Sequence, residues 1–243
     1  MNILILGGTS EARQLASRLV ALGHEVTTSL AGRTQDPILP EGGLRMGPFG
    51  GVAGLCAYLR AAGVERLVDA THPYAGLMSI NAAAAAEETG IRLVRYMRPP
   101  WAPQPGQDWT MVGSAQEAAD CLPKGAKVLL TTGHAGLETY LRREDCSFLV
   151  RVIEAPSMDL PLHAQLIQTR PPYGLDDEIA LIGGHGVTHL ISKNSGGAQT
   201  SAKLEAARQA GVRVIMIARP HYGPALEVDS VEAALAALDV GSA

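Results

Sequence analysis

Short unbroken apolar runs alternate along this chain with segments in which apolar residues recur every three or four positions. The runs, bounded by glycine and polar residues, predict strands buried on both faces, and the spaced segments predict amphipathic helices. The predicted strands cover residues 2–6, 25–30, 44–46, 66–70, 91–96, 127–131, 147–153, 187–192 and 212–218. The predicted helices cover residues 11–22, 52–62, 79–90, 114–122, 137–142, 176–184, 200–210 and 230–238. Strands alternating with helices are typical of an α/β protein with parallel sheets.

The alternation is interrupted once, by a proline-rich segment. Residues 98–106 contain four prolines, which can continue neither a helix nor a central strand. Because the alternation starts again beyond this segment, we expect two domains, covering residues 1–98 and 99–243. Arg95, Arg98 and Trp101 would face a cleft between them, unless Arg98 and Trp101 simply stack on each other in the linker.

Composition limits the classes of function. The 243 residues are 47% hydrophobic and carry a net charge of −4, so the bulk charge favours neither nucleic acid nor an anionic membrane as a partner. The chain starts directly with a strand and has no long apolar span, so we expect no signal peptide and no membrane helix. Its three cysteines are far apart, so we expect buried thiols in a reducing cytoplasm and no metal site.

The first candidate site is the turn after the first strand. Gly7, Gly8, Thr9 and Ser10 separate that strand from a predicted helix. Thr9 or Ser10 can cap the helix, and its free N–H groups make an anion pocket at the carboxyl end of the strand. The pattern is weaker than the complete G-x-G-x-x-G fingerprint of dinucleotide sites, so a plain connection is the alternative.

Arg33 follows the second predicted strand, where an NAD site usually offers a carboxylate to the ribose. No acidic residue ends that strand, and an arginine there suits a 2′-phosphate. This favours NADP over NAD, with a solvated loop arginine as the alternative.

Two further strand ends carry polar clusters. Thr71, His72 and Pro73 follow residues 66–70, at the sheet edge expected for Gly7. A histidine that only bonds the backbone of its loop is the alternative for His72. In the second half, Lys193, Asn194, Ser195, Gly196 and Gly197 provide a cation, small polar groups and flexible backbone suited to an anion, or else an ordinary flexible loop.

Taken in order, these segments resemble the precorrin-6A reductase (CobK/CbiJ) family. The resemblance rests on residues 4–12, 69–75, 98–101, 132–133 and 192–197 and extends over essentially the whole chain. It implies two Rossmann-like parallel-sheet domains with the active site in the cleft between them. It also implies NADPH-dependent reduction of one double bond of precorrin-6A, giving precorrin-6B in cobalamin biosynthesis.

The resemblance allows roles to be assigned. The N-terminal domain would bind NADP: Gly7, Gly8, Thr9 and Ser10 the pyrophosphate, Arg33 the 2′-phosphate, and Thr71, His72 and Pro73 the nicotinamide side. The C-terminal domain would contribute substrate binding. The substrate's carboxylates would meet Arg95, Arg98, Lys193 and the segment of Asn194, Ser195, Gly196 and Gly197. His72, His134, Lys193 or water would supply the proton that completes the reduction.

Three alternatives stay open at this point. The related cobalt-precorrin-6A reductase of the anaerobic pathway often uses NADH. Another nucleotide-using α/β enzyme, such as a tetrapyrrole methyltransferase, would bind S-adenosylmethionine instead. A Rossmann-like sensor would bind a dinucleotide without turnover. Neighbouring enzymes of the corrin pathway are the expected protein partners.

Overall fold

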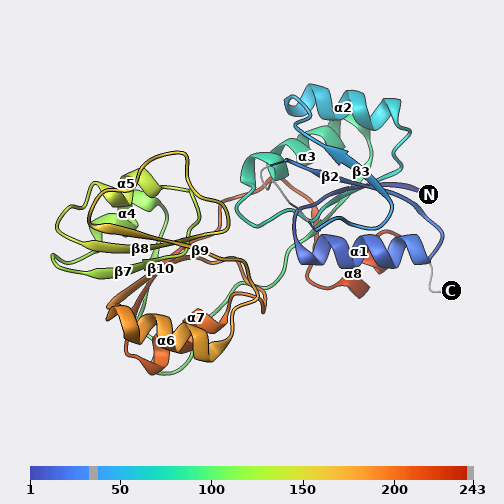
Figure 1. The fold of residues 1–243 in the computed structure, drawn as a ribbon. Helices are drawn as coiled ribbons and strands as arrows, with labels where there is room; N and C mark the ends of the chain where they lie inside the picture. Colours follow the sequence, from blue (N-terminus) through green and yellow to red (C-terminus); the bar gives the residue numbers. More distant parts are fainter. Residues whose placement is uncertain (33–37, 240–243) are drawn as a thin grey trace. The chain divides into compact units, whose positions relative to one another are not determined.

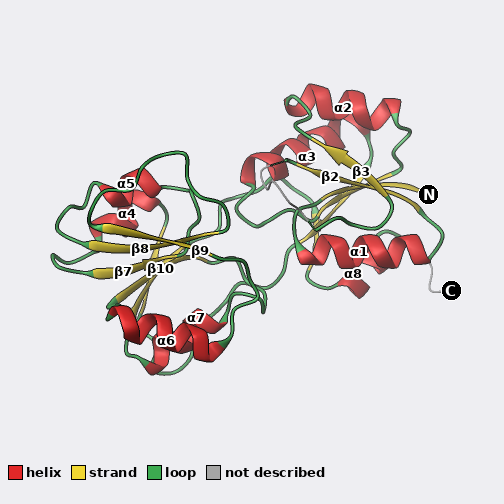
Figure 2. Cartoon of the chain, in the orientation of Figure 1, coloured by secondary structure: helices red, strands yellow, loops and turns green. Residues whose placement is uncertain are grey.

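A computed structural model describes residues 1–32 and 38–239, which fold as two compact α/β units. The first unit consists of residues 1–99 and 220–243, and the second of residues 100–219. Figures 1 and 2 show sheets with helices on both faces in each unit. Each unit is described by itself below.

The sheet of the first unit is parallel throughout the described residues, in the order β12-β5-β4-β1-β2-β3. Its strands are β1 (Asn2–Leu6), β2 (Glu25–Leu30), β3 (Gly43–Met46), β4 (Arg66–Asp69), β5 (Arg92–Tyr96) and β12 (Leu226–Val228). Its helices are α1 (Ser10–Ala21), α2 (Gly51–Ala61), α3 (Gly76–Thr89) and α8 (Val231–Ala237). One buried cluster packs α1 and α8 on one face of the sheet, and another packs α2 and α3 on the other. This is the Rossmann strand order, with a C-terminal strand in the sixth position.

The second unit repeats this arrangement. Its parallel sheet has the order β6-β11-β10-β7-β8-β9 in the described residues. Its strands are β6 (Trp109–Val112), β7 (Lys127–Leu130), β8 (Ser147–Val152), β9 (Ala164–Gln168), β10 (His189–Lys193) and β11 (Arg213–Ile217). Its helices are α4 (Ala115–Asp120), α5 (Leu137–Leu141), α6 (Leu175–His185) and α7 (Ala202–Gln209). Figure 1 shows α4 and α5 on one face of the sheet and α6 and α7 on the other.

The predicted α/β class with two Rossmann-like parallel sheets is therefore confirmed, but the domain limits differ from the prediction. We expected the second domain to continue to residue 243, whereas residues 220–243 belong to the first unit. The reason is strand pairing: β12 adds to the edge of β5, and α8 packs against α1. The sixth position of the second sheet is filled instead by β6, which precedes the rest of its own sheet in sequence.

The three strands that the pattern did not predict are the short, partly exposed strands β6, β9 and β12. Each lies at an edge of its sheet, where a strand buries fewer side chains and leaves no apolar run. The predicted central strands agree with the structure to within a residue or two. Helix α3 begins at Gly76, three residues before its predicted start.

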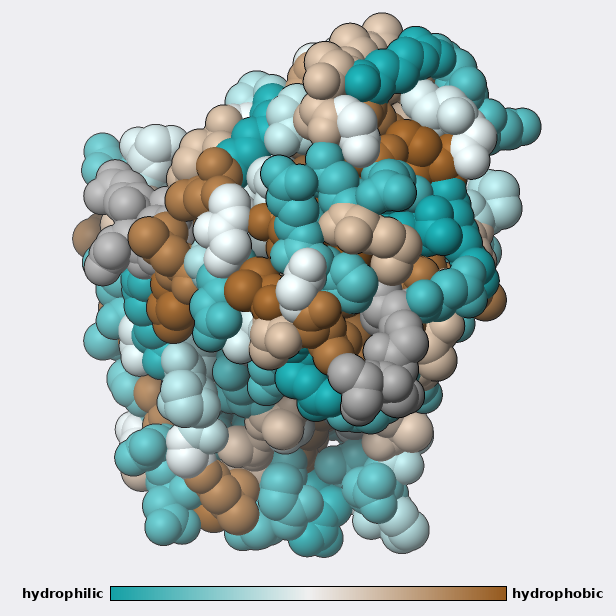
Figure 3. Space-filling model, turned by 90° about the vertical axis from the view of Figure 1, so that its right-hand side faces the viewer, coloured by the Kyte–Doolittle hydropathy of each residue, from teal (hydrophilic) through white to brown (hydrophobic). Residues whose placement is uncertain are grey.

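The outer surface shows no separation into apolar and polar regions on the face drawn in Figure 3, where both kinds of residue are interspersed. Within the described ranges, every helix is too short or too polar to cross a membrane.

Candidate functional site

The turn between β1 and α1 requires glycine at both of its first positions. The Gly7 N–H donates to the Ser29 carbonyl at 2.9 Å, and a Cβ on Gly7 would lie 2.6 Å from Cγ2 of Thr28. Gly8 adopts a φ of +110°, in the region that favours glycine. Two different requirements therefore explain the two glycines, namely lack of space at Gly7 and backbone conformation at Gly8.

Thr9, rather than Ser10, caps α1. Its Oγ1 accepts from the Ala12 N–H at 3.0 Å and donates to the Ala70 carbonyl at 2.8 Å. The same side chain therefore orients the start of α1 and ties it to the end of β4. Ser10 is the first residue of the helix, and its hydroxyl donates to Glu11 at 2.9 Å.

The segment after β4 is held by side chains at its base. Oδ1 of buried Asp69 accepts from Oγ1 of Thr71 at 2.7 Å. Farther along, Nδ1 of His72 accepts from the Tyr74 N–H at 3.2 Å. In the neutral imidazole this hydrogen bond places the ring proton on Nε2. The prediction that the ends of β1 and β4 share one edge is confirmed by their parallel pairing.

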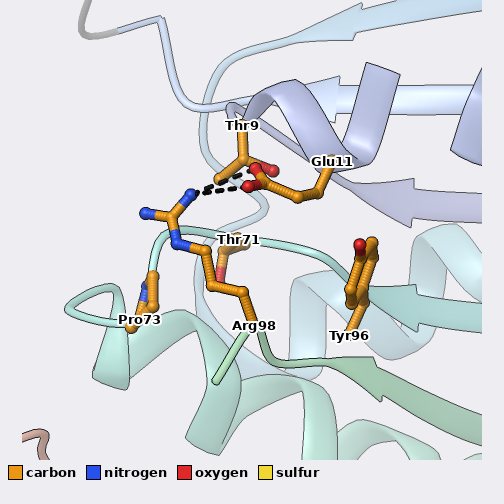
Figure 4. Close-up of a pocket in the computed structure, with 6 residues that line it drawn as sticks. All are labelled: Thr9, Glu11, Thr71, Pro73, Tyr96 and Arg98. Carbon is orange, nitrogen blue, oxygen red and sulfur yellow. Dashed lines mark hydrogen bonds and ion pairs between the residues drawn. The ribbon is translucent and has the colours of Figure 1, made fainter. Parts of the chain in front are cut away.

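A pocket in the first unit brings several of these groups together (Figure 4). It is lined by Thr9, Glu11, Thr71, Pro73, Tyr96 and Arg98. Thr9, Thr71 and Pro73 come from the predicted cofactor residues, and Gly7, Gly8, Ser10 and His72 are close neighbours of these three in the sequence. Arg98, which we assigned to the substrate, extends across the pocket toward α1.

An ion pair covers the start of α1. Nη1 of Arg98 donates to both carboxylate oxygens of Glu11 at 3.0 Å. Burial opposes ionisation of Glu11, but the charge and hydrogen bonding of Arg98, together with hydrogen bonds from the Glu11 backbone and Ser10, outweigh it and lower the pKa of this carboxyl. Glu11 is thus an anion at the helix end that we expect to bind phosphate, and Arg98 balances its charge. Tyr96 completes the wall, and burial and the charge of Glu11 raise the pKa of its hydroxyl.

Sequence reasoning did not select Glu11 or Tyr96. The sequence did contain one signal for Glu11: it is a carboxylate in the first turn of a helix that we expect to bind phosphate, where an anion needs a cation beside it. Tyr96 had none, because it reads as the last residue of a buried strand.

Arg95 requires a correction. Its side chain is 1% exposed, and its Nε donates to Oδ2 of Asp69 at 3.1 Å. Its Nη1 donates to the Gly223 carbonyl and to Glu227. Because the guanidinium is buried with its charge matched inside the fold, it does not reach a substrate carboxylate, and we remove it from the substrate site.

The second candidate region lies in the second unit, at the carboxyl end of β10. Asn194 exchanges two hydrogen bonds with the backbone of Trp101, at 2.8 and 3.0 Å. The indole Nε1 of Trp101 donates to the Gly197 carbonyl, and Arg219 donates to the carbonyls of Asn194 and Ser195. The loop is therefore anchored from both sides rather than loose. The side chain of Asn194 is used in this anchoring and is buried.

The remaining predicted residues of this region differ in exposure. Gly196 and Gly197 have φ values of 68° and 83°, in the left-handed region that favours glycine. Lys193, the last residue of β10, is half-buried. His134 is exposed in the turn after β7, and its Nε2 lies 2.7 Å from the Glu154 carbonyl, so Nε2 carries a proton.

Two predictions lie beyond what the structure describes, and the roles assigned to the other site residues also stay predictions. Arg33 lies outside the described residues. The cleft between the two domains also stays a prediction, because each unit is described by itself.

Potential metal ligands and thiols are both present in the described part of the chain. No group of three or more His, Cys, Asp or Glu side chains there is arranged to hold a metal ion. Cys56 and Cys146 are buried free thiols, as expected, but Cys121 is exposed.

Comparison with known proteins gives consistent matches over the full length. The family model described as precorrin-6x reductase CbiJ/CobK matches residues 2–239. A precorrin-6A reductase of Rhodococcus erythropolis is 46% identical over 238 residues, covering 97% of this chain and 96% of the relative. A cobalt-precorrin-6A reductase of Priestia megaterium is 31% identical, covering 91% and 92%. A solved structure described as CobK precorrin-6A reductase has a TM-score of 0.93 and 39% identity, covering 100% of this chain and 98% of that one.

Proposed function

The chain belongs to the precorrin-6x reductase CbiJ/CobK family, and on that premise we propose that it uses NADPH to reduce one double bond of precorrin-6A, giving precorrin-6B. It is an oxidoreductase of cobalamin biosynthesis. The observation that carries the choice of substrate is the graded similarity. The precorrin-6A reductases are 39–46% identical to the chain, and the cobalt-precorrin-6A reductases 29–31%. We further propose that it acts in the cytoplasm beside other enzymes of the pathway.

A reductase of this family uses a nicotinamide cofactor, and the first unit fits one. Gly7 has no room for a side chain, Thr9 caps α1, and Thr9 and Glu11 at the start of that helix line the pocket. These are the features with which a helix start holds a pyrophosphate. When bound, the cofactor supplies the hydride. The protein binds and orients the cofactor and the substrate and keeps water out of the site. We assign Gly7, Gly8, Thr9 and Ser10 to the pyrophosphate and Thr71, His72 and Pro73 to the nicotinamide side.

The substrate is a flat ring with several carboxylates, which needs cations and N–H donors. We propose that Lys193 and the backbone N–H groups of Gly196 and Gly197 bind these carboxylates in the cleft between the domains, since the Ser195 N–H donates to the Lys193 carbonyl within the loop. The buried Asn194 acts by fixing the loop. Arg98 pairs with Glu11 at the start of α1, so we now assign it to the phosphates of the cofactor.

Reduction also needs a proton. The Nε2–H of His134 faces a backbone carbonyl, so this proton already has an acceptor. His72 accepts a backbone hydrogen bond at Nδ1, which leaves its proton on Nε2. Of the two histidines, we propose His72 as the donor because it lies between the pocket residues Thr71 and Pro73 in the sequence, whereas His134 belongs to the second unit, with Lys193 and water as the competing sources.

The decisive experiment mixes the purified protein with NADPH and precorrin-6A and follows the absorbance of both. We expect NADPH oxidation to match conversion of the macrocycle one to one. Parallel reactions contain NADH in place of NADPH, or cobalt-precorrin-6A in place of precorrin-6A. Binding of NADPH without any turnover would instead identify a dinucleotide sensor, and faster turnover of the cobalt substrate would assign the chain to the anaerobic pathway.

Replacement of Arg33 by alanine tests the choice of NADPH. A hydrogen bond between charged groups contributes about 1.5 kcal/mol or more, which corresponds to about tenfold in affinity. We expect Kd for NADPH to rise about tenfold and Kd for NADH to stay within about twofold, measured by cofactor fluorescence. Equal changes for both cofactors would remove Arg33 from the 2′-phosphate site.

Replacement of Arg98 by methionine should weaken both cofactors alike, by about tenfold, because the pyrophosphate is common to them. The change also leaves Glu11 unneutralised beside the phosphates. The double variant Arg98→Met with Glu11→Gln should therefore recover part of the affinity. A variant that binds NADPH normally but has a raised KM for precorrin-6A would return Arg98 to the substrate site.

A further inference from the structure

We infer that Arg95 and Tyr222 are positioning residues of the reductase: they hold Thr71 and Pro73 in place in the pocket without contacting either substrate. The inference rests on the proposed function, since it gives a purpose to the position of this segment. All of the contacts that carry it lie within the first unit.

The first part of the connection runs through Asp69. The two oxygens of this buried carboxylate are used separately, Oδ2 by Nε of Arg95 and Oδ1 by Oγ1 of Thr71. The carboxylate is thus fixed from the side of β5 and in turn fixes Thr71, which lines the pocket. Because Oδ2 of Asp69 is fixed by Arg95, Oδ1 points in one direction, and the Thr71 hydroxyl that donates to Oδ1 is fixed with it.

The second part runs through the segment that returns from the second unit. Arg95 donates from Nη1 to the Gly223 carbonyl at 2.8 Å, and its guanidinium lies 5.0 Å from the centre of the Tyr222 ring. A Cβ on Gly223 would lie 2.5 Å from Cβ of Ala83, so the segment packs directly on α3. The hydroxyl of Tyr222 then donates to the Pro73 carbonyl. Pro73 is the other pocket residue of the segment.

Both supports therefore converge on one buried cation. Thr71 is reached from Arg95 through Asp69, and Pro73 is reached from Arg95 through Tyr222. The hydrogen bond from the Thr9 hydroxyl to the Ala70 carbonyl fixes the same segment a third time, to the start of α1. A segment held at residues 69, 70, 71 and 73 is more constrained than a loop connecting a strand and a helix requires.

Such constraint matters because hydride transfer depends strongly on geometry. A misplacement of about 1 Å can lower a rate by about 100-fold. Loosening the segment should therefore reduce the rate of the chemical step more than the affinity for the cofactor, most of which comes from the phosphates.

The test is Tyr222→Phe, which keeps the ring beside Arg95 and removes only the hydroxyl that bonds Pro73. In the protein without ligands, hydrogen exchange should become about fivefold or more faster in residues 72–78 and stay unchanged in the second unit. With precorrin-6A, kcat should fall about tenfold while Kd for NADPH stays within about twofold. The isotope effect on kcat with NADPH deuterated at the transferred position should rise, because hydride transfer becomes slower relative to product release.

Tyr140→Phe is the matched control. The hydroxyl of Tyr140 is buried without a hydrogen-bond partner in the described structure, so its removal should leave exchange, kcat and isotope effect unchanged. The inference is overturned if Tyr222→Phe matches the wild type in exchange or in kcat, or if its lower kcat comes with an unchanged isotope effect, as simple loss of folded protein would give. If the wild-type protein does not oxidise NADPH with precorrin-6A, the proposed function fails, and the exchange measurement still decides whether Tyr222 holds the segment.

Discussion

Replacing Arg95 with methionine should lower the free energy of unfolding of the first unit by about 3–5 kcal/mol, which is the usual cost of leaving one member of a buried ion pair without its partner. Asp69 would stay buried at 1% exposure with Oδ2 unpaired. The Gly223 carbonyl and Glu227 would lose the same donor, so the returning segment would also be loosened. This is a large part of the stability of a typical domain.

Urea unfolding followed by circular dichroism measures this effect, with Arg60→Met as the control. Arg60 forms an ion pair with Glu88 in the same unit, but both side chains are more than half exposed, so we expect a loss below about 1 kcal/mol. Both tryptophans, Trp101 and Trp109, belong to the second unit, so fluorescence follows that unit separately. Equal unfolding midpoints for Arg95→Met and Arg60→Met would contradict the assignment of Arg95 to a buried structural pair.

Replacing Lys193 with alanine should lower kcat/KM for precorrin-6A by about 100-fold, because a hydrogen bond between charged groups contributes up to about 3 kcal/mol and a carboxylate of the ring would lose its cation. The fluorescence Kd for NADPH should stay within about twofold. Steady-state kinetics at saturating NADPH measure the first quantity.

The control removes a lysine from the same sheet, but at the amino-terminal end of its strands rather than the carboxyl end. Lys127 begins β7, whereas Lys193 ends β10, so Lys127→Ala changes the net charge equally but far along the strands from the proposed site. We expect it to retain the wild-type kcat/KM. If Lys193→Ala abolished NADPH binding instead, Lys193 would belong to the phosphate site.

The central strands and the α1 turn were predictable because local sequence determines them. An apolar run, two glycines and a capping hydroxyl need no information from elsewhere in the chain. The edge strands were not predictable, because β12 has mostly exposed residues and becomes a strand only through its pairing with β5.

The candidate site divides in the same way. Thr9 and Thr71 could be grouped in advance, since the ends of parallel neighbouring strands meet at one edge. The role of Arg95 could not, because nothing in the sequence near it distinguishes a free cation from a buried one. Its partners Asp69 and Glu227 lie 26 and 132 residues away. Asn194 was predicted to bind substrate, but its side chain anchors the loop through bonds to Trp101 that span 93 residues and that local sequence does not reveal.

The pairing of β12 with β5 also has a consequence for biosynthesis. A ribosome releases residues 100–219 before residues 220–239, so the second unit can fold while the first still lacks its outer strand and α8. During that interval β5 exposes an unpaired edge, and the apolar residues that Leu235 and Leu238 later cover are in contact with water. A premature stop codon after residue 219 would make this vulnerable intermediate permanent, and such a product should aggregate or be degraded.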